Sequence, residues 1–193
     1  LFSITRVNGS WCPYCNIGKL CDDADCMTCH EKSFANHPRS ANWHPTLNGT
    51  TTPRQVTRAT SKKYQFKCEK CPHNFPASLD KVNNGKWCPY CNHAKLCEDA
   101  DCLTCHKKSF ASHSRAENWH PTLNVDVTPR QRSIGSKKKH WFKCDKCPHD
   151  FHTVLYSVTS LIPAWCPYCC VPHQKLCEDE TCEMCLGNSF ASH

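Results

Sequence analysis

The residues of this chain that can do chemistry are its cysteines, which number 20 among 193 residues. Apart from the C-x2-C steps inside the three-cysteine pattern described below, ten of them form five C-x2-C pairs: Cys12/Cys15, Cys68/Cys71, Cys88/Cys91, Cys144/Cys147 and Cys166/Cys169. A C-x2-C turn directs two thiolates at one metal ion about 2.3 Å away, as in zinc knuckles. Secreted disulfide scaffolds rarely consist of such pairs alone, so the spacing favours zinc over a disulfide framework, which remains the alternative.

Four of these pairs combine into two complete four-cysteine sets. Their spacing is C-x2-C-x16-C-x2-C in the first set and has a central gap of 18 in the second: Cys68, Cys71, Cys88 and Cys91, then Cys144, Cys147, Cys166 and Cys169. Such gaps are typical of two β-hairpin knuckles that face each other across one zinc ion. Cys12 and Cys15 would be the second half of a third ribbon of this kind.

A second pattern, C-x4-C-x2-C-x7-H, occurs three times with identical spacing: Cys21, Cys26, Cys29 and His37; Cys97, Cys102, Cys105 and His113; Cys177, Cys182, Cys185 and His193. His30 and His106 compete for the fourth position, but the third copy has Leu186 there. We therefore assign the histidine seven residues on, in the first turn of a helix capped by Ser33, Ser109 or Ser189. This assignment predicts five complete zinc sites.

Some cysteines and histidines allow other interpretations. A register that pairs Cys88 and Cys91 with Cys102 and Cys105 would leave Cys97 without partners. Cys170 is left over and is interpreted as a spare thiol. His44 and His120 have no third copy against which to test them. His73 and His149, which follow the upstream knuckles, are interpreted as structural residues or neighbours of the ligands rather than as catalytic groups.

The elements that must position these ligands repeat along the chain. Trp-Cys-Pro-Tyr-Cys starts at residues 11, 87 and 165, and Asn-Trp-His-Pro-Thr-Leu-Asn starts at 42 and 118. Alternating apolar residues on both sides of each upstream knuckle predict a β-hairpin with the knuckle as its turn. Residues 33–42 and 109–118 predict a short helix, and Thr-Pro at 52 and 128 opens another. Four residues of the second motif are interpreted as packing residues rather than a binding platform: Trp43, Leu47, Trp119 and Leu123.

The fold class predicted is a small zinc-stabilised α+β protein, built of tandem zinc-ribbon/treble-clef repeats of about 76 residues with little conventional core. The predicted segments are a truncated ribbon half (1–20), mixed Cys/His fingers (21–42, 97–118 and 177–193) and ribbons (43–96 and 119–176). Both ends fall within a repeat, which is expected of a segment of a longer tandem protein.

The combined motif resembles a known family. Trp-His-Pro-x-x-Asn, Thr-Pro, Ser-x-Lys-Lys, Phe-Lys-Cys-x-x-Cys-Pro-His-x-Phe and Trp-Cys-Pro-Tyr-Cys are similar to the "probable zinc-ribbon" treble-clef repeats. Those repeats occur in tandem arrays of giant DNA viruses and mycorrhizal fungi, and as single copies near phage and bacterial nucleases. The resemblance implies zinc as cofactor and a non-enzymatic module.

The formal charge of +7 would suggest a nucleic-acid partner, but it counts the cysteines as neutral. Zinc held by four thiolates is a dianion, and zinc held by three thiolates and a neutral histidine is a monoanion. Five occupied sites would bring the chain close to neutrality. Local basic lobes remain at 53–70 and 129–146, with these candidate phosphate contacts: Arg54, Arg58, Lys62, Lys63, Arg130, Lys137, Lys138 and Lys139. Solvated faces and docking onto acidic loops of neighbours are the alternatives.

The sequence shows no catalytic set and no open zinc position, so we expect no enzyme and no small-molecule substrate. We expect a scaffold or bridging module whose partners are other proteins of a large assembly, for example a virion; the alternative is a nucleic-acid-binding finger array. Zinc thiolates indicate a reducing compartment: cytoplasm, nucleus or virus factory. No apolar run reaches the ~20 residues that a membrane span needs.

Overall fold

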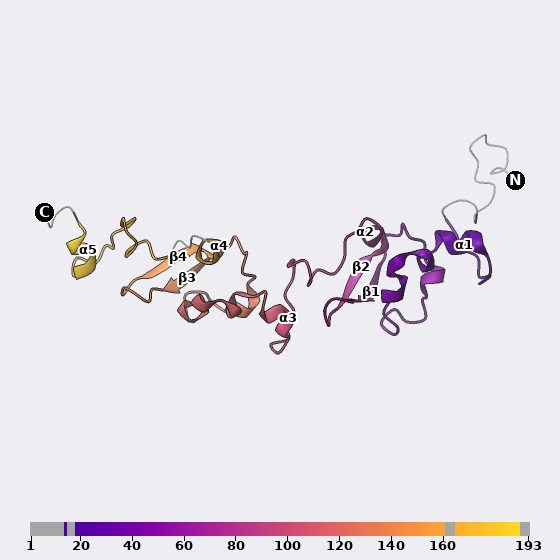
Figure 1. Cartoon of the computed structure of the whole chain (residues 1–193), viewed down its shortest axis with the longest axis horizontal. Helices are drawn as coiled ribbons and strands as arrows, with labels where there is room; N and C mark the ends of the chain where they lie inside the picture. Colours follow the sequence, from indigo (N-terminus) through magenta and orange to yellow (C-terminus); the bar gives the residue numbers. More distant parts are fainter. Residues whose placement is uncertain (1–13, 15–17, 161–164, 190–193) are drawn as a thin grey trace, which may run out of the picture. The chain divides into compact units, whose positions relative to one another are not determined.

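The computed structural model describes residue 14 and residues 18–160 and 165–189, and the chain divides into two compact units, 1–94 and 95–193 (Figure 1). The predicted ligands Cys12, Cys15 and His193 lie outside the described residues. Among the described residues, no helix is long and apolar enough to cross a membrane.

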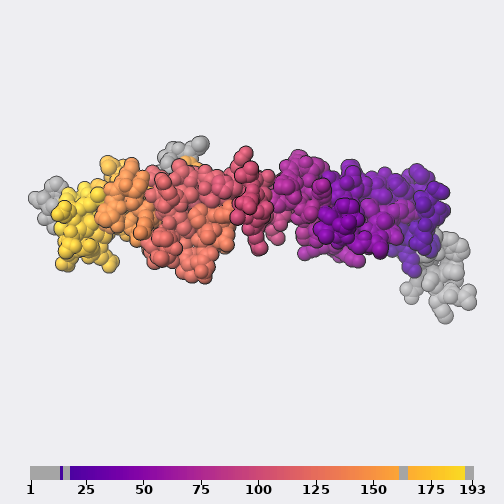
Figure 2. Space-filling view, turned by 90° about the horizontal axis from the view of Figure 1, so that it is seen from below, coloured from indigo at the N-terminus to yellow at the C-terminus, as the bar shows by residue number. Residues whose placement is uncertain are grey.

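Unit 1 places a short finger before a hairpin. The finger consists of α1 (Met27–Lys32) and the 3₁₀ turns η1 (Phe34–Asn36) and η2 (Pro38–Asn42). A third turn, η3 (Pro53–Gln55), leads to strands β1 (Lys63–Lys67) and β2 (Asn74–Ser78) and to helix α2 (Leu79–Asn83). In Figure 2 the finger, in indigo, lies directly against the remainder of this unit, in purple.

Unit 2 repeats this order and adds a second finger. It contains α3 (Leu103–His106), η4 (Phe110–Ser112), η5 (Ser114–Asn118) and η6 (Pro129–Gln131). Strands β3 (Lys139–Lys143) and β4 (Asp150–Val154) and helix α4 (Leu155–Thr159) follow. Helix α5 (Glu183–Gly187) belongs to the second finger.

Each hairpin turns through its upstream knuckle, as predicted. The strands pair antiparallel with Phe66 opposite Phe75, and with Phe142 opposite Phe151. The Cys68 N–H donates to the His73 carbonyl oxygen at 3.1 Å, which closes the first knuckle directly beyond the strands. Two-stranded sheets are marginal by themselves, so packing and the metal sites must stabilise them.

The finger and the ribbon that follows it share one core. Phe34 is fully buried against Phe66 of β1, with 5.6 Å between the ring centroids, and Phe75 and Leu79 complete this core. In unit 2, Phe110 takes the place of Phe34, at 5.8 Å from Phe142. The segments 21–42 and 97–118 are therefore packed onto the ribbons that follow them.

The tryptophan motif attaches its loop to the hairpin edge. The Asn48 side chain pairs with the backbone of Gln65, accepting from its N–H at 2.8 Å and donating to its carbonyl at 2.9 Å. Trp43 packs against the core and donates from Nε1 to the Thr51 carbonyl at 3.1 Å. Leu47, by contrast, is 56 % exposed. The packing interpretation is therefore confirmed for the tryptophan.

The predicted helix over 33–42 is wrong in form, because the segment makes two 3₁₀ turns, η1 and η2. Ser33 does not cap it: its hydroxyl donates back to the His30 carbonyl at 2.7 Å. The turn at Thr52 begins as predicted, with a capping box in which Gln55 Oε1 accepts from the Thr52 N–H.

Candidate metal centres

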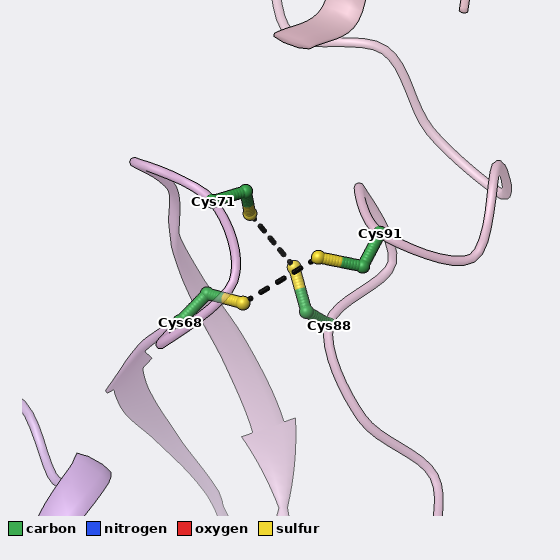
Figure 3. Close-up of side chains that lie close together, drawn as sticks. All are labelled: Cys68, Cys71, Cys88 and Cys91. Carbon is green, nitrogen blue, oxygen red and sulfur yellow. Dashed lines mark hydrogen bonds between the residues drawn. The ribbon is translucent and has the colours of Figure 1, made fainter.

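The four-cysteine set of unit 1 converges between the two knuckles (Figure 3). Cys68 Sγ lies 3.5 Å from Cys91 Sγ, and Cys71 Sγ lies 3.6 Å from Cys88 Sγ. All four sulfurs lie within 4.8 Å of one another. One pair comes from the hairpin turn and the other from the Trp-Cys-Pro-Tyr-Cys knuckle, as the spacing predicts.

The corresponding set of unit 2 has the same geometry. Cys144 Sγ lies 3.6 Å from Cys169 Sγ, and Cys147 Sγ lies 3.5 Å from Cys166 Sγ. A tetrahedron with metal–sulfur bonds of about 2.3 Å has edges of about 3.8 Å, whereas a disulfide needs about 2.05 Å. Among the described residues no cysteine forms a disulfide. The sulfur positions therefore fit a tetrahedral metal ion and not disulfides.

The electrostatics of these sites favour a bound cation. Burial raises the pKa of the Cys71 and Cys88 thiols to about 11, and that of Cys169 to about 12. Four adjacent thiolates without a compensating charge would repel one another at close range. A bound dication removes this penalty, because deprotonation and metal binding occur together.

The mixed centre in the second finger of unit 2 contains His149, Cys177, Cys182 and Cys185. His149 Nε2 lies 3.4 Å from Cys182 Sγ and 3.5 Å from Cys185 Sγ. Cys182 caps α5 and Cys185 lies within it, while His149 comes from the hairpin turn just before β4. One repeat earlier the sequence carries the equivalent residues His73, Cys97, Cys102 and Cys105.

The predicted fourth ligand of the mixed centres is therefore wrong. His113, predicted as a ligand, stacks on Phe110 with 5.4 Å between centroids, and its Nδ1 accepts from the Arg115 N–H at 3.1 Å. His37 does the same with Phe34 and with the Arg39 N–H. Both rings cap a 3₁₀ turn and cover the core, and neither belongs to a metal-ligand group of the described residues. Their constant spacing has this structural cause.

The first finger holds only a group of three, Cys21, Cys26 and Cys29, among the described residues. A histidine equivalent to His73 would fall one 76-residue step earlier, before residue 1. Within unit 1 and within unit 2, the described residues therefore provide three groups with four donor atoms each, where five complete sites were predicted.

Two arginines predicted as phosphate contacts instead contact the first loop of a finger. Arg54 Nη2 donates to the Asp23 carbonyl at 2.6 Å and lies 3.7 Å from Cys21 Sγ. Arg130 makes the same contacts in unit 2, at 2.7 Å with the Asp99 carbonyl and 3.6 Å from Cys97 Sγ. The guanidinium places positive charge beside the first thiolate of the finger and fixes its loop. Sequence reasoning missed this role because 33 residues separate the partners.

The other predicted phosphate contacts differ in exposure. Arg58 Nη2 donates to the Glu31 carbonyl at 2.6 Å, so it too braces the finger. The lysines are exposed: Lys62, Lys63, Lys137, Lys138 and Lys139. The basic lobes therefore present lysine rather than arginine to solvent.

In each unit a second arginine of the first finger contacts the knuckles of the ribbon that follows. Arg115 lies over the Trp165 ring, 4.1 Å from its centroid, and pairs with Asp145 at 2.6 Å. Trp165 Nε1 donates to the same carboxylate at 2.8 Å. Arg39 likewise lies over Trp87 and pairs with Glu69, but Trp87 Nε1 is buried without a hydrogen-bond partner among the described residues.

Comparison with known proteins agrees with this architecture. The family model described as "Probable Treble clef zinc finger domain" matches residues 40–94 and 115–172, which are the two ribbons. An uncharacterized protein of Acanthamoeba polyphaga mimivirus is 37 % identical over 182 residues. That alignment covers 92 % of this chain but only 43 % of the relative, so the chain spans less than half of the viral protein's length.

Proposed function

This chain belongs to the family of the Probable Treble clef zinc finger domain, and on that premise we propose that it is a non-enzymatic scaffold that bridges proteins of a large assembly. Zinc is the ion we propose for its centres, because tetrahedral sets of cysteine and histidine suit zinc. The metal then maintains the fold, and the surfaces of the repeats make the contacts.

The observation that carries this proposal is the complete set of protein donors at each centre. Each of the three groups that lie within one unit already supplies four donor atoms, two groups with sulfur alone and one with an imidazole. Catalytic zinc needs an open position for water or substrate, which a closed tetrahedral site lacks. A closed site is suited to holding short segments together where apolar burial is small.

A virus particle is the assembly we propose first, because a relative of this chain is found in a mimivirus. Thiolate centres of this kind persist in a reducing compartment, so we place the folding of the chain in cytoplasm, nucleus or virus factory. The partners on this proposal are proteins rather than small molecules.

Nucleic-acid binding is the second candidate, favoured by the exposed lysines at 62–63 and 137–139. Two observations weaken it. Arg54 and Arg130 contact the fingers, and two dianionic centres and one monoanionic centre remove most of the formal charge of +7. Nucleic-acid affinity depends strongly on such phosphate contacts.

Sedimentation of the zinc-loaded full-length protein from expressing cells separates the two candidates. A scaffold should sediment with a large assembly, resist nuclease, and fall to the top of the gradient when a chelator removes zinc. The triple variant Lys137→Gln, Lys138→Gln, Lys139→Gln should sediment unchanged. Release by nuclease together with loss of sedimentation in the triple variant would instead establish nucleic-acid binding. A protein that stays at the top of the gradient in every condition would overturn both.

A further inference from the structure

His149 touches two metal centres of unit 2 at once. Its Nδ1 lies 3.3 Å from Cys147 Sγ, a member of the four-cysteine set. Its Nε2 lies 3.4 and 3.5 Å from Cys182 and Cys185 Sγ, members of the mixed set. One imidazole ring therefore stands between the sulfurs of two sites.

The chemistry of imidazole determines which ring nitrogen can bind a metal ion and which can donate a hydrogen bond. A neutral ring has one nitrogen with a proton and one with a lone pair. If Nε2 coordinates the ion of the mixed centre, the proton must reside on Nδ1, which then donates to Cys147 Sγ. A histidine ligand usually donates its other N–H to a carboxylate or carbonyl. Here the acceptor is a thiolate that itself belongs to another centre.

The ribbon also fixes the orientation of this ring. Tyr168 stacks on His149 with 4.4 Å between centroids and 19° between the ring planes. Tyr168 lies in the second knuckle, between the ligands Cys166 and Cys169. The Cys144 N–H donates to the His149 carbonyl at 3.1 Å, which holds the backbone as well. Both knuckles of the ribbon therefore position the ligand of the finger.

The same arrangement recurs in unit 1, which shows that it is a property of the repeat. His73 Nδ1 lies 3.2 Å from Cys71 Sγ. Tyr90 stacks on His73 with 4.2 Å between centroids and 18° between planes. Both contacts lie within the ribbon of unit 1.

From these contacts we infer that His149 couples the two centres of unit 2, so that metal in the four-cysteine site prepares the histidine ligand of the mixed site. Because coupling between two binding equilibria is reciprocal, metal in the finger strengthens the ribbon site by the same factor. The inference concerns how the centres fill and is independent of the scaffold role.

The test follows each cysteine in the zinc-loaded full-length chain by alkylation under a chelator, with peptide mass mapping. Tyr168→Leu leaves every ligand in place, yet should lower the protection of Cys177, Cys182 and Cys185 by about tenfold. Tyr156→Leu is the matched control, because Tyr156 is 55 % exposed in the same unit, and should change nothing. Unchanged protection of the finger cysteines in Tyr168→Leu would overturn the coupling.

Reciprocity supplies a second arm. Cys182→Ser removes a ligand of the finger and leaves the ribbon set intact, so Cys147 should become more reactive than in the parent chain. A Cys147 that keeps its full protection would mean independent sites. Nitrogen NMR of the imidazoles adds a readout of the bridge: His149 should show a proton on Nδ1 that exchanges slowly and loses its protection in Cys182→Ser. An Nε2–H tautomer in the zinc-loaded protein would contradict the assignment.

Discussion

The imidazole of His140 lies against the indole of Trp119, with 4.6 Å between the ring centroids. His140 is 7 % exposed, and its Nε2 is buried without a hydrogen-bond partner. Burial, helped by the neighbouring charges of Arg132, His152 and Lys138, lowers the pKa of His140 to about 4. Unit 1 has Tyr64 at the equivalent position, tilted against Trp43 with 4.7 Å between the ring centroids.

This buried histidine predicts a loss of stability in acid. Below about pH 6.5 the unfolded chain binds a proton at His140, whereas the folded protein does so only near pH 4. The free energy of unfolding should therefore fall as the pH drops through this window, by at most about 3 kcal/mol. His140→Tyr, which introduces the residue type that unit 1 has at Tyr64, should remove this contribution. Denaturant curves of the two zinc-loaded proteins from pH 7 to pH 5 provide the comparison, and parallel curves would refute it.

Phe110 should be the residue that keeps the first finger of unit 2 on its ribbon. Phe110→Ala leaves a cavity beside Phe142 and should lower the free energy of unfolding by about 3–5 kcal/mol. Leu103→Ala is the matched control, because Leu103 is 73 % exposed in the same finger and should change stability by less than about 0.5 kcal/mol. Denaturant unfolding with zinc present measures both. Equal effects of the two substitutions would show that the finger has no core of its own.

Arg130 should tune the metal affinity of the finger that it contacts. Arg130→Gln removes positive charge beside Cys97 and the hydrogen bond to the Asp99 carbonyl, so the affinity of that centre should fall about 10–100-fold. Arg130→Lys keeps the charge and should lose less. Chelator competition, read by alkylation of Cys97, measures the change. Lys137→Gln, at an exposed position, is the control, and an equal loss there would argue for a general electrostatic effect.

At least three ions should be held tightly. The three groups that have four donors within one unit should keep zinc under a chelator concentration that empties the group of Cys21, Cys26 and Cys29, since that group has only three donors among the described residues. Native mass spectrometry of the full chain during a chelator titration counts the ions directly. Five ions lost together would mean that another residue completes the first finger.

Cysteine spacing was sufficient to predict both four-cysteine sets, because a knuckle fixes the direction of its two sulfurs within a few residues. The strand alternation around Phe66 and Phe142 was equally local. The histidine assignment failed because the true ligand lies 28 residues upstream of Cys177, beyond any local pattern. A usable signal was present: the Cys-Pro-His motif repeats His73 and His149 at the 76-residue step, each one upstream of a three-cysteine set.

The histidine of the knuckle also has a consequence for how the chain is made. All ligands of the second ribbon, from Cys144 to Cys169, precede Cys177 in the sequence. They therefore leave the ribosome before the first cysteine of the next finger is translated. A ribbon that has already taken up its ion can present His149 to three thiols that are still emerging. The repeats can then bind their metal ions one after another during synthesis. Few thiols without metal remain when translation of the chain is finished.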